Sequence, residues 1–223
     1  HPGTPQAILT LADGRQVVLD KKPVTLKLNE KQFLTGDSAI LNYAVNLPNG
    51  LENNEQQTLM HKVEVPVGGE YRLVLADGTK VWINAESSLQ YPVEFTAEQR
   101  TVILQGEAYF EVAKNPDKRF VVTCNGVEIE ALGTEFNVKA YPADSVITTT
   151  LAKGKVKVFN NEQSVTLLPN GVATYHMKQQ TIQSSTVDDI SVANYWRTGQ
   201  LVFEAEPLSS IARTMERMYN VKI

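Results

Sequence analysis

Residues 71–84 read Tyr-Arg-Leu-Val-Leu-Ala-Asp-Gly-Thr-Lys-Val-Trp-Ile-Asn, and this stretch indicates the fold. Apolar and polar side chains alternate on both sides of Asp77-Gly78, and both of these residues tolerate the positive φ that a tight turn requires. The stretch therefore predicts two antiparallel strands joined by a hairpin. Asn125-Gly126 separates residues 119–124 from residues 127–132 in the same manner, which predicts a second hairpin.

Short runs with strand character continue along the chain. The further strands that we expect cover residues 101–105, 108–112, 136–140, 146–151, 155–159, 164–168 and 172–177. Gly106 lies between two of these runs and indicates a bend or bulge. Many short strands at this spacing predict a mainly β protein, folded as an antiparallel β-sandwich or β-roll.

A sequence similar to the turn of the first hairpin occurs near the start of the chain. Residues 11–17 read Leu-Ala-Asp-Gly-Arg-Gln-Val, and residues 75–81 read Leu-Ala-Asp-Gly-Thr-Lys-Val. Two explanations stay open, namely one efficient turn used twice in independent hairpins and a true repeated unit.

The periodicity changes near the end of the chain. Pro207 suits the first turn of a helix, and Asn220 can end one in the left-handed conformation. The apolar residues between them recur at helical spacing, namely Leu208, Ile211, Ala212, Met215 and Tyr219. Residues 201–203 and 221–223 are strand-like. These features predict a small C-terminal β-α-β unit after the β-sheet domain.

Composition excludes several classes of protein. The chain has 223 residues, a net charge of −4, 42% hydrophobic and 21% charged residues, which is ordinary for a globular domain. The absence of a concentrated basic cluster argues against nucleic acid as a partner. No run approaches the roughly 20 apolar residues of a membrane span, so we expect any targeting or anchoring segment to precede residue 1.

The search for catalytic chemistry gives no site. The histidines lack metal-ligand spacing, Cys124 is expected to be a buried small hydrophobe, and Gly-rich phosphate loops and nucleophile elbows are absent. Glu107 and Glu111 share a strand face with Tyr109, which superficially resembles a glycosidase pair. We interpret them as solvated or turn-capping carboxylates. We therefore expect a non-enzyme without cofactor or metal.

A family resemblance extends from about residue 65 onward. It rests on several motifs in order over some 160 residues: Pro66–Tyr71, Leu75–Leu89, Tyr91-Pro92, Leu104–Ala113, Leu132–Val138, Ala140–Pro142, Thr150–Val156, Trp196 and Phe203–Leu208. In these motifs the chain resembles the extracytoplasmic part of FecR-family anti-sigma factors of the Bacteroidetes type. Residues 1–62 match more loosely.

The resemblance implies an organisation and a function. Residues 1–62 would be an N-terminal β segment, 63–190 the FecR-like all-β domain, and 191–223 a truncated β-α-β signalling unit similar to the short domain of secretins and TonB-dependent receptors. The full protein would be a single-pass inner-membrane protein with a cytoplasmic domain that holds a sigma factor. Its periplasmic part would receive a signal from the N-terminal signalling domain of a TonB-dependent outer-membrane receptor.

Two strand edges of the terminal unit are the predicted partner-binding residues. They are Leu201, Val202 and Phe203 on one side of the helix, and Val221, Lys222 and Ile223 on the other. Edge pairing gives affinity through backbone hydrogen bonds and asks little of the side chains.

Two other functions stay open as alternatives. A surface or periplasmic carbohydrate-binding β domain could use Trp82, Tyr91 and Trp196 as an aromatic platform. A glycan-processing enzyme could use Glu107 and Glu111.

Overall fold

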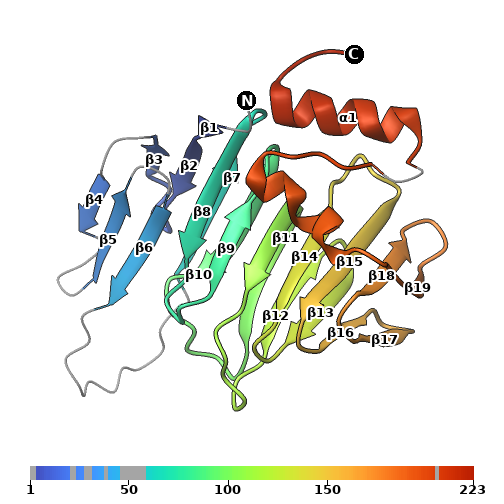
Figure 1. Ribbon diagram of the computed structural model, residues 1–223. Coiled ribbons are helices and arrows are strands. Elements are labelled where there is room, and N and C mark those ends of the chain that lie inside the picture. The colour runs from blue at the N-terminus through green and yellow to red at the C-terminus, as the bar shows by residue number, and fades with distance from the viewer. Residues whose placement is uncertain (1–3, 21–23, 28–31, 38–39, 46–58, 204–205) are drawn as a thin grey trace.

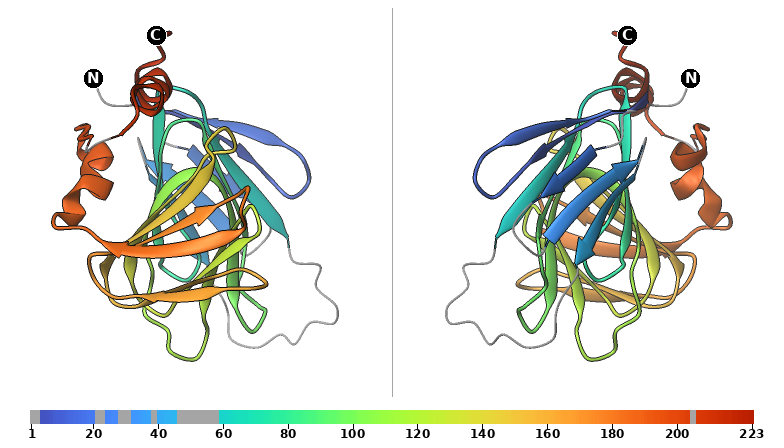
Figure 2. Two further views of the ribbon diagram at one scale, coloured as in Figure 1. Left: turned by 90° about the vertical axis from the view of Figure 1, so that its right-hand side faces the viewer. Right: turned by 90° about the vertical axis from the view of Figure 1, so that its left-hand side faces the viewer.

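The computed structural model describes residues 4–20, 24–27, 32–37, 40–45, 59–203 and 206–223. It is mainly β, as predicted. Its strands form two sheets that pack face to face, and the C-terminal helix lies across one end of this sandwich (Figure 1, Figure 2). Within the described residues no helix combines the length and the apolar character needed to cross a membrane.

The first sheet, sheet I, is antiparallel apart from one parallel pair, β11 with β12. Its strands in spatial order are β3 (Gln16–Leu19), β2 (Ala7–Thr10), β7 (Met60–Val65), β10 (Ser87–Pro92), the first half of β11 (Arg100–Glu111), β12 (Phe120–Cys124), β13 (Val127–Ala131), β16 (Val156–Phe159) and β17 (Ser164–Leu167).

The second sheet, sheet II, is antiparallel apart from the pair β6 with β8. Its strands in spatial order are β4 (Val24–Lys27), β5 (Gln32–Asp37), β6 (Ile40–Val45), β8 (Gly69–Val74), β9 (Lys80–Ile83), the second half of β11, β14 (Glu135–Ala140), β15 (Val146–Lys153), β18 (Gly171–His176) and β19 (Thr181–Thr186). A short strand, β1 (Thr4–Pro5), pairs in parallel with the start of β8.

Successive hairpins alternate between the two sheets. β12 and β13 pair in sheet I, as the Asn125-Gly126 turn predicts, and β14 and β15 pair in sheet II. β16 and β17 return to sheet I, and β18 and β19 end in sheet II. The chain therefore builds both layers at the same time, and the predicted hairpin at Asp77-Gly78 is confirmed as β8 and β9.

β11 belongs to both sheets, and Gly106 is where it changes from one to the other. We predicted two strands, 101–105 and 108–112, but the structure has one strand that pairs with β10 before Gly106 and with β14 after it. Gly106 has a φ of 95°, and a Cβ atom there would collide with Ser87 Oγ and lie 2.7 Å from Ser87 Cα. Both the backbone angle and the close approach require glycine. The predicted bend is thus a crossing between sheets.

The core lies between the sheets. Phe110 on the sheet II half of β11 contacts Phe120 of sheet I, with ring centroids 6.0 Å apart, and stacks on Phe136 at 5.2 Å. Cys124 is buried in this core, as expected, and burial raises the pKa of its thiol to about 12. A thiol in this environment is unreactive at neutral pH.

The terminal unit has the predicted helix but not the predicted strands. A 3₁₀ helix, η1 (Ile190–Thr198), is followed by α1 (Leu208–Tyr219), which ends at Asn220 with a φ of 53°, as expected. Residues 201–203 and 221–223 are not strands, which corrects our β-α-β prediction. A strand needs a neighbour for its backbone hydrogen bonds, and no described strand pairs with either segment.

The two Leu-Ala-Asp-Gly turns share their backbone hydrogen bonds but differ in their surroundings. Asp13 Oδ1 accepts from the N–H of Arg15 at 3.0 Å, and Asp77 Oδ1 accepts from the N–H of Thr79 at 2.9 Å. Asp13 is exposed, whereas Asp77 also forms a 2.6 Å ion pair with Arg100. The Arg100 side chain is 1% exposed, and it also donates to the carbonyls of Ala113 and Lys118. The second turn is therefore tied to the core.

A buried histidine predicts acid sensitivity. His61 on β7 is 4% exposed, and burial lowers its pKa from 6.5 to about 4, although nearby Asp13 opposes this shift. The unfolded chain binds a proton near pH 6.5, but the folded chain does so only near pH 4. Stability should therefore fall as the pH drops through this window, by up to roughly 3 kcal/mol.

The measurement is urea unfolding from pH 7.5 to pH 4 of wild type and His61→Phe, which keeps an aromatic ring beside Tyr91. The variant should lose less stability over this range than wild type. Equal pH dependence of the two proteins would contradict the assignment to His61.

Candidate functional site: the C-terminal segment and the hollow beneath it

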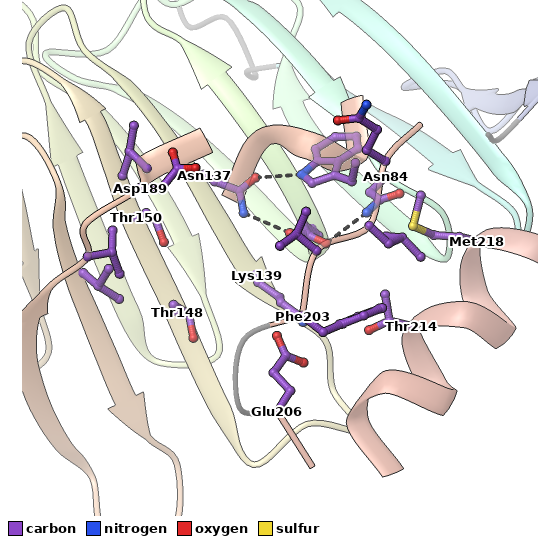
Figure 3. A pocket seen from close by; sticks show the side chains of 18 residues that line it. Asn84, Asn137, Lys139, Thr148, Thr150, Asp189, Phe203, Glu206, Thr214 and Met218 are labelled. Carbon is purple, nitrogen blue, oxygen red and sulfur yellow. Dashed lines mark hydrogen bonds between the residues drawn. The ribbon is translucent and has the colours of Figure 1, made fainter. Parts of the chain in front are cut away.

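A buried polar network lies on the outer face of sheet II. Glu107, 8% exposed, accepts hydrogen bonds from the Nδ2 atoms of Asn84 and Asn137, each at 2.9 Å. Asn84 Oδ1 accepts from the N–H of Ala85 at 2.8 Å, and Asn137 Oδ1 accepts from Trp196 Nε1 at 3.2 Å (Figure 3). Since both amide oxygens are engaged, the orientation of both amides is set, with their NH₂ groups toward the carboxylate.

Trp196 belongs to the chain segment that covers this network. We define the C-terminal segment as residues 190–203 and 206–223. η1 lies against the outer side of sheet II, as Figure 2 shows. Trp196 of η1 and Met218 of α1 are buried against Tyr109 of β11, with Leu201 packed beside them. This small apolar cluster is separate from the core between the sheets.

An arginine–aromatic stack continues the contact. The Arg197 guanidinium lies 3.7 Å from the centroid of the Tyr109 ring and 4.8 Å from that of Trp82. Arg72 of β8 also stacks on Trp82, at 4.6 Å. Burial raises the pKa of the Tyr109 hydroxyl to about 12, so this ring stays neutral at physiological pH. Cation–π contacts of this kind hold η1 on the sheet.

Arg217 fastens α1 to the loops at the end of the sandwich. Its side chain is 8% exposed, stacks 3.8 Å from the centroid of Tyr141, and forms ion pairs with Glu86 at 3.0 Å and Asp144 at 3.2 Å. Its backbone carbonyl accepts from the N–H of Gly68 at 2.7 Å. Burial would lower the Arg217 pKa, but the hydrogen bonds and charge of Asp144 raise it above its ordinary value. A charged residue thus carries much of the docking of α1.

Part of the apolar surface of α1 is exposed. Leu208, Met215 and Tyr219 are 83%, 36% and 37% exposed, whereas Arg217 and Met218 are buried. Met218 is buried, and Ile211 and Ala212 are half-buried, so the domain covers only part of the apolar surface of the helix. Apolar residues therefore remain available for another contact.

A hollow of about 300 Å³ lies between sheet II and the C-terminal segment (Figure 3). Its floor is formed by polar residues of the sheet, namely Asn84, Glu107, Asn137, Lys139, Thr148 and Thr150. Its other side is mainly apolar, with Trp196, Leu201, Phe203 and Met218. A hollow with apolar walls and a few converging polar groups has the general character of a ligand site.

Comparison with known proteins identifies the family. The model of the family described as "FecR protein" matches residues 61–157. Two crystal structures of a "putative anti-sigma factor" from Parabacteroides distasonis ATCC 8503, at 2.50 and 1.65 Å resolution, are similar to this chain. The sequences are 35% identical in both comparisons. The match to the 2.50 Å structure covers 72% of this chain and 75% of the other chain. The match to the 1.65 Å structure covers 71% of this chain and 74% of the other chain, and both matches have a TM-score of 0.69. The chain belongs to the FecR family of anti-sigma factors.

Membership has direct consequences for this FecR-family chain. The family is regulatory and typically membrane-anchored, and an anti-sigma factor has a sigma factor as its partner.

No curated protein matches the sequence of this chain. Among the described residues, no group of three or more potential metal-ligating side chains comes together.

The predicted contact residues of the FecR-family chain divide into two groups. Leu201 packs into the Tyr109 cluster and Phe203 lines the hollow, so both are directed toward the domain. Val202 also lines the hollow but is 39% exposed. Val221 and Ile223 are 45% and 70% exposed, and Lys222 is exposed as well. The structure therefore leaves Val202 and residues 221–223 accessible, although none of them lies in a strand.

The aromatic platform of the carbohydrate-binding alternative does not form. Tyr91 is 1% exposed in the core between the sheets, whereas Trp196 is buried on the outer face of sheet II. Alternation along β10 points Tyr91 into the core, whereas Trp82 of β9 packs beside Trp196 of η1 on the outer face, so the three rings do not form one surface.

Glu107 and Glu111 do share a face with Tyr109, as predicted. Glu107, however, is held by two amides and is not the solvated group that we expected. Glu107 was singled out because it shares a strand face with Tyr109. Its partners, Asn84 directly after β9 and Asn137 of β14, were not predicted. Arg217 was not among the predicted site residues, and no sequence feature marked it as buried.

Proposed function

We propose that this chain is the periplasmic sensor region of a transmembrane anti-sigma factor. It relays a signal from a TonB-dependent outer-membrane receptor to a cytoplasmic sigma factor by protein–protein contact. Family membership supports the regulatory role, and the exposed apolar residues of the C-terminal segment support a protein partner. The N-terminal signalling domain of the receptor is the partner that we propose.

The observation that carries this proposal is the set of apolar residues that α1 leaves exposed. The helix docks through Arg217, with its ion pairs to Glu86 and Asp144, and exposes Leu208, Met215 and Tyr219. Exposed apolar groups gain free energy when a partner removes them from water. In this proposal residues 63–190 are the scaffold, residues 1–62 extend its sheets, and residues 191–223 are the signalling unit.

A binding titration tests the proposal. The chain is titrated with the N-terminal signalling domain of the receptor encoded beside it, and the variants are Val202→Asp and Ile223→Asp. Both residues are exposed, so folding should be unaffected, and a charge in the contact should weaken binding by about tenfold or more. Val18→Asp is the matched control, because Val18 is 62% exposed on β3 of sheet I.

Saturable binding that both C-terminal variants weaken and Val18→Asp leaves intact would agree with the proposal. Absence of binding by a chain that unfolds cooperatively would contradict it, as would equal affinity of all variants.

A further inference from the structure

The floor of the hollow holds polar groups whose bonding capacity is not used. Lys139 has no ion pair or hydrogen bond within the described part of the chain, and the same holds for the hydroxyls of Thr148 and Thr150. Glu107 uses one lone pair on each oxygen for Asn84 and Asn137 and keeps the others. These groups face one hollow from three neighbouring strands (Figure 3).

The charges of the floor limit the chemistry of a ligand. Glu107 and Lys139 are register partners on β11 and β14, so they lie side by side, yet no ion pair forms between them. A phosphate or other anion would be repelled by the Glu107 carboxylate, and Asp189 and Glu206 also line the hollow. A simple cation would be repelled by the Lys139 ammonium. A neutral ligand avoids both repulsions.

Hydroxyl groups satisfy both kinds of floor residue. Each hydroxyl can donate to the Glu107 carboxylate and accept from the Lys139 ammonium or a threonine hydroxyl. Adjacent hydroxyls on a ring would reach neighbouring strands, which are about 5 Å apart. The C–H face of the same ring suits the apolar side of the hollow, formed by Trp196, Leu201, Phe203 and Met218.

From this arrangement we infer that the hollow beneath the C-terminal segment is a binding site for a neutral polyhydroxylated ligand, with the chemistry of a single saccharide unit. Glu107, Lys139 and Thr148 contact its hydroxyl groups, and Asn84 and Asn137 hold Glu107 in place. The site differs from the aromatic platform excluded above. The two proposals can fail separately, because Ile223→Asp changes the receptor contact outside the hollow, whereas Val202 lines the hollow.

A ligand in this site would bridge the sheet and the C-terminal segment. Because floor and roof come from different parts of the chain, bound ligand stabilises the docked arrangement by mass action. We therefore expect saccharide to raise the melting temperature and to slow amide hydrogen exchange in residues 190–203.

The test is ligand-observed NMR and isothermal titration of the chain with glucose, galactose, mannose and N-acetylglucosamine. For a ligand of this size a dissociation constant in the millimolar range is expected. Glu107→Gln removes the charge of the floor and places an NH₂ group against the NH₂ of either Asn84 or Asn137. Lys139→Met removes an ammonium that makes no contact needed for folding. Each should weaken binding by about tenfold. Lys155→Met is the control, since Lys155 is exposed between β15 and β16.

The inference requires that at least one of these sugars binds and that both floor variants weaken it, with Lys155→Met unchanged. Failure of all four sugars to bind overturns it. Binding that is equal in wild type, Glu107→Gln and Lys139→Met also overturns it, because the sugar would then lie elsewhere. Thermal unfolding of each variant confirms that it is folded.

Discussion

Replacement of Asp77 by alanine should lower the free energy of unfolding by about 3–5 kcal/mol, as expected when a buried ion pair loses one partner. Arg100 is 1% exposed and has its 2.6 Å ion pair with Asp77. In the variant its guanidinium stays in the core, beside Phe120, without a counter-charge. The variant also loses the hydrogen bonds from the N–H and hydroxyl of Thr79 to the carboxylate. Chemical denaturation measures the change.

The matched control is Asp13→Ala in the other Leu-Ala-Asp-Gly turn. Asp13 accepts the same backbone hydrogen bond, but its ion pair with Arg15 is exposed, so the loss should be far smaller. Similar losses in the two variants would show that the turn itself, and not the buried Arg100, sets the cost.

Gly106→Ala should lower the free energy of unfolding by roughly 3 kcal/mol, because strain and overpacking add. The φ of 95° is unfavourable for alanine, and the new Cβ would collide with Ser87 Oγ and lie 2.7 Å from Ser87 Cα. Ser87 Oγ accepts from the N–H of Glu107 at 2.9 Å, so a shift of Ser87 would also disturb the floor of the hollow.

Gly126→Ala separates the two contributions. Gly126 has a φ of 82° and nothing within 4 Å of the position of a Cβ, so only the backbone strain applies, about 1 kcal/mol. Thermal unfolding of the two variants gives the comparison. If Gly106→Ala lost no more stability than Gly126→Ala, the result would contradict the close packing of β11 against Ser87.

Local sequence predicted the hairpins and the β class because turn chemistry and alternation act over a few residues. Asp77-Gly78 and Asn125-Gly126 are turns for reasons contained in the residues themselves. The crossing at Gly106 was only partly predicted, since alternation continues through the glycine. Its close approach to Ser87 depends on a neighbouring strand.

The candidate site could not be predicted in the same way. The hydrogen bond from Trp196 to Asn137 joins residues 59 positions apart in the sequence, and the one from Arg217 to Glu86 joins residues 131 positions apart. No local pattern encodes contacts over such distances. Helical spacing correctly located α1, but it could not show that Arg217 would be buried. Its burial depends on Glu86 and Asp144 from two separate loops.

The most direct test of the receptor-contact proposal is amide hydrogen exchange of this chain with and without the N-terminal signalling domain of the receptor. The proposal predicts added protection in residues 201–203 and 208–223, and none in the hairpins β12–β13 and β16–β17 of sheet I. Protection confined to those sheet I hairpins, or no change at saturating receptor domain, would contradict it.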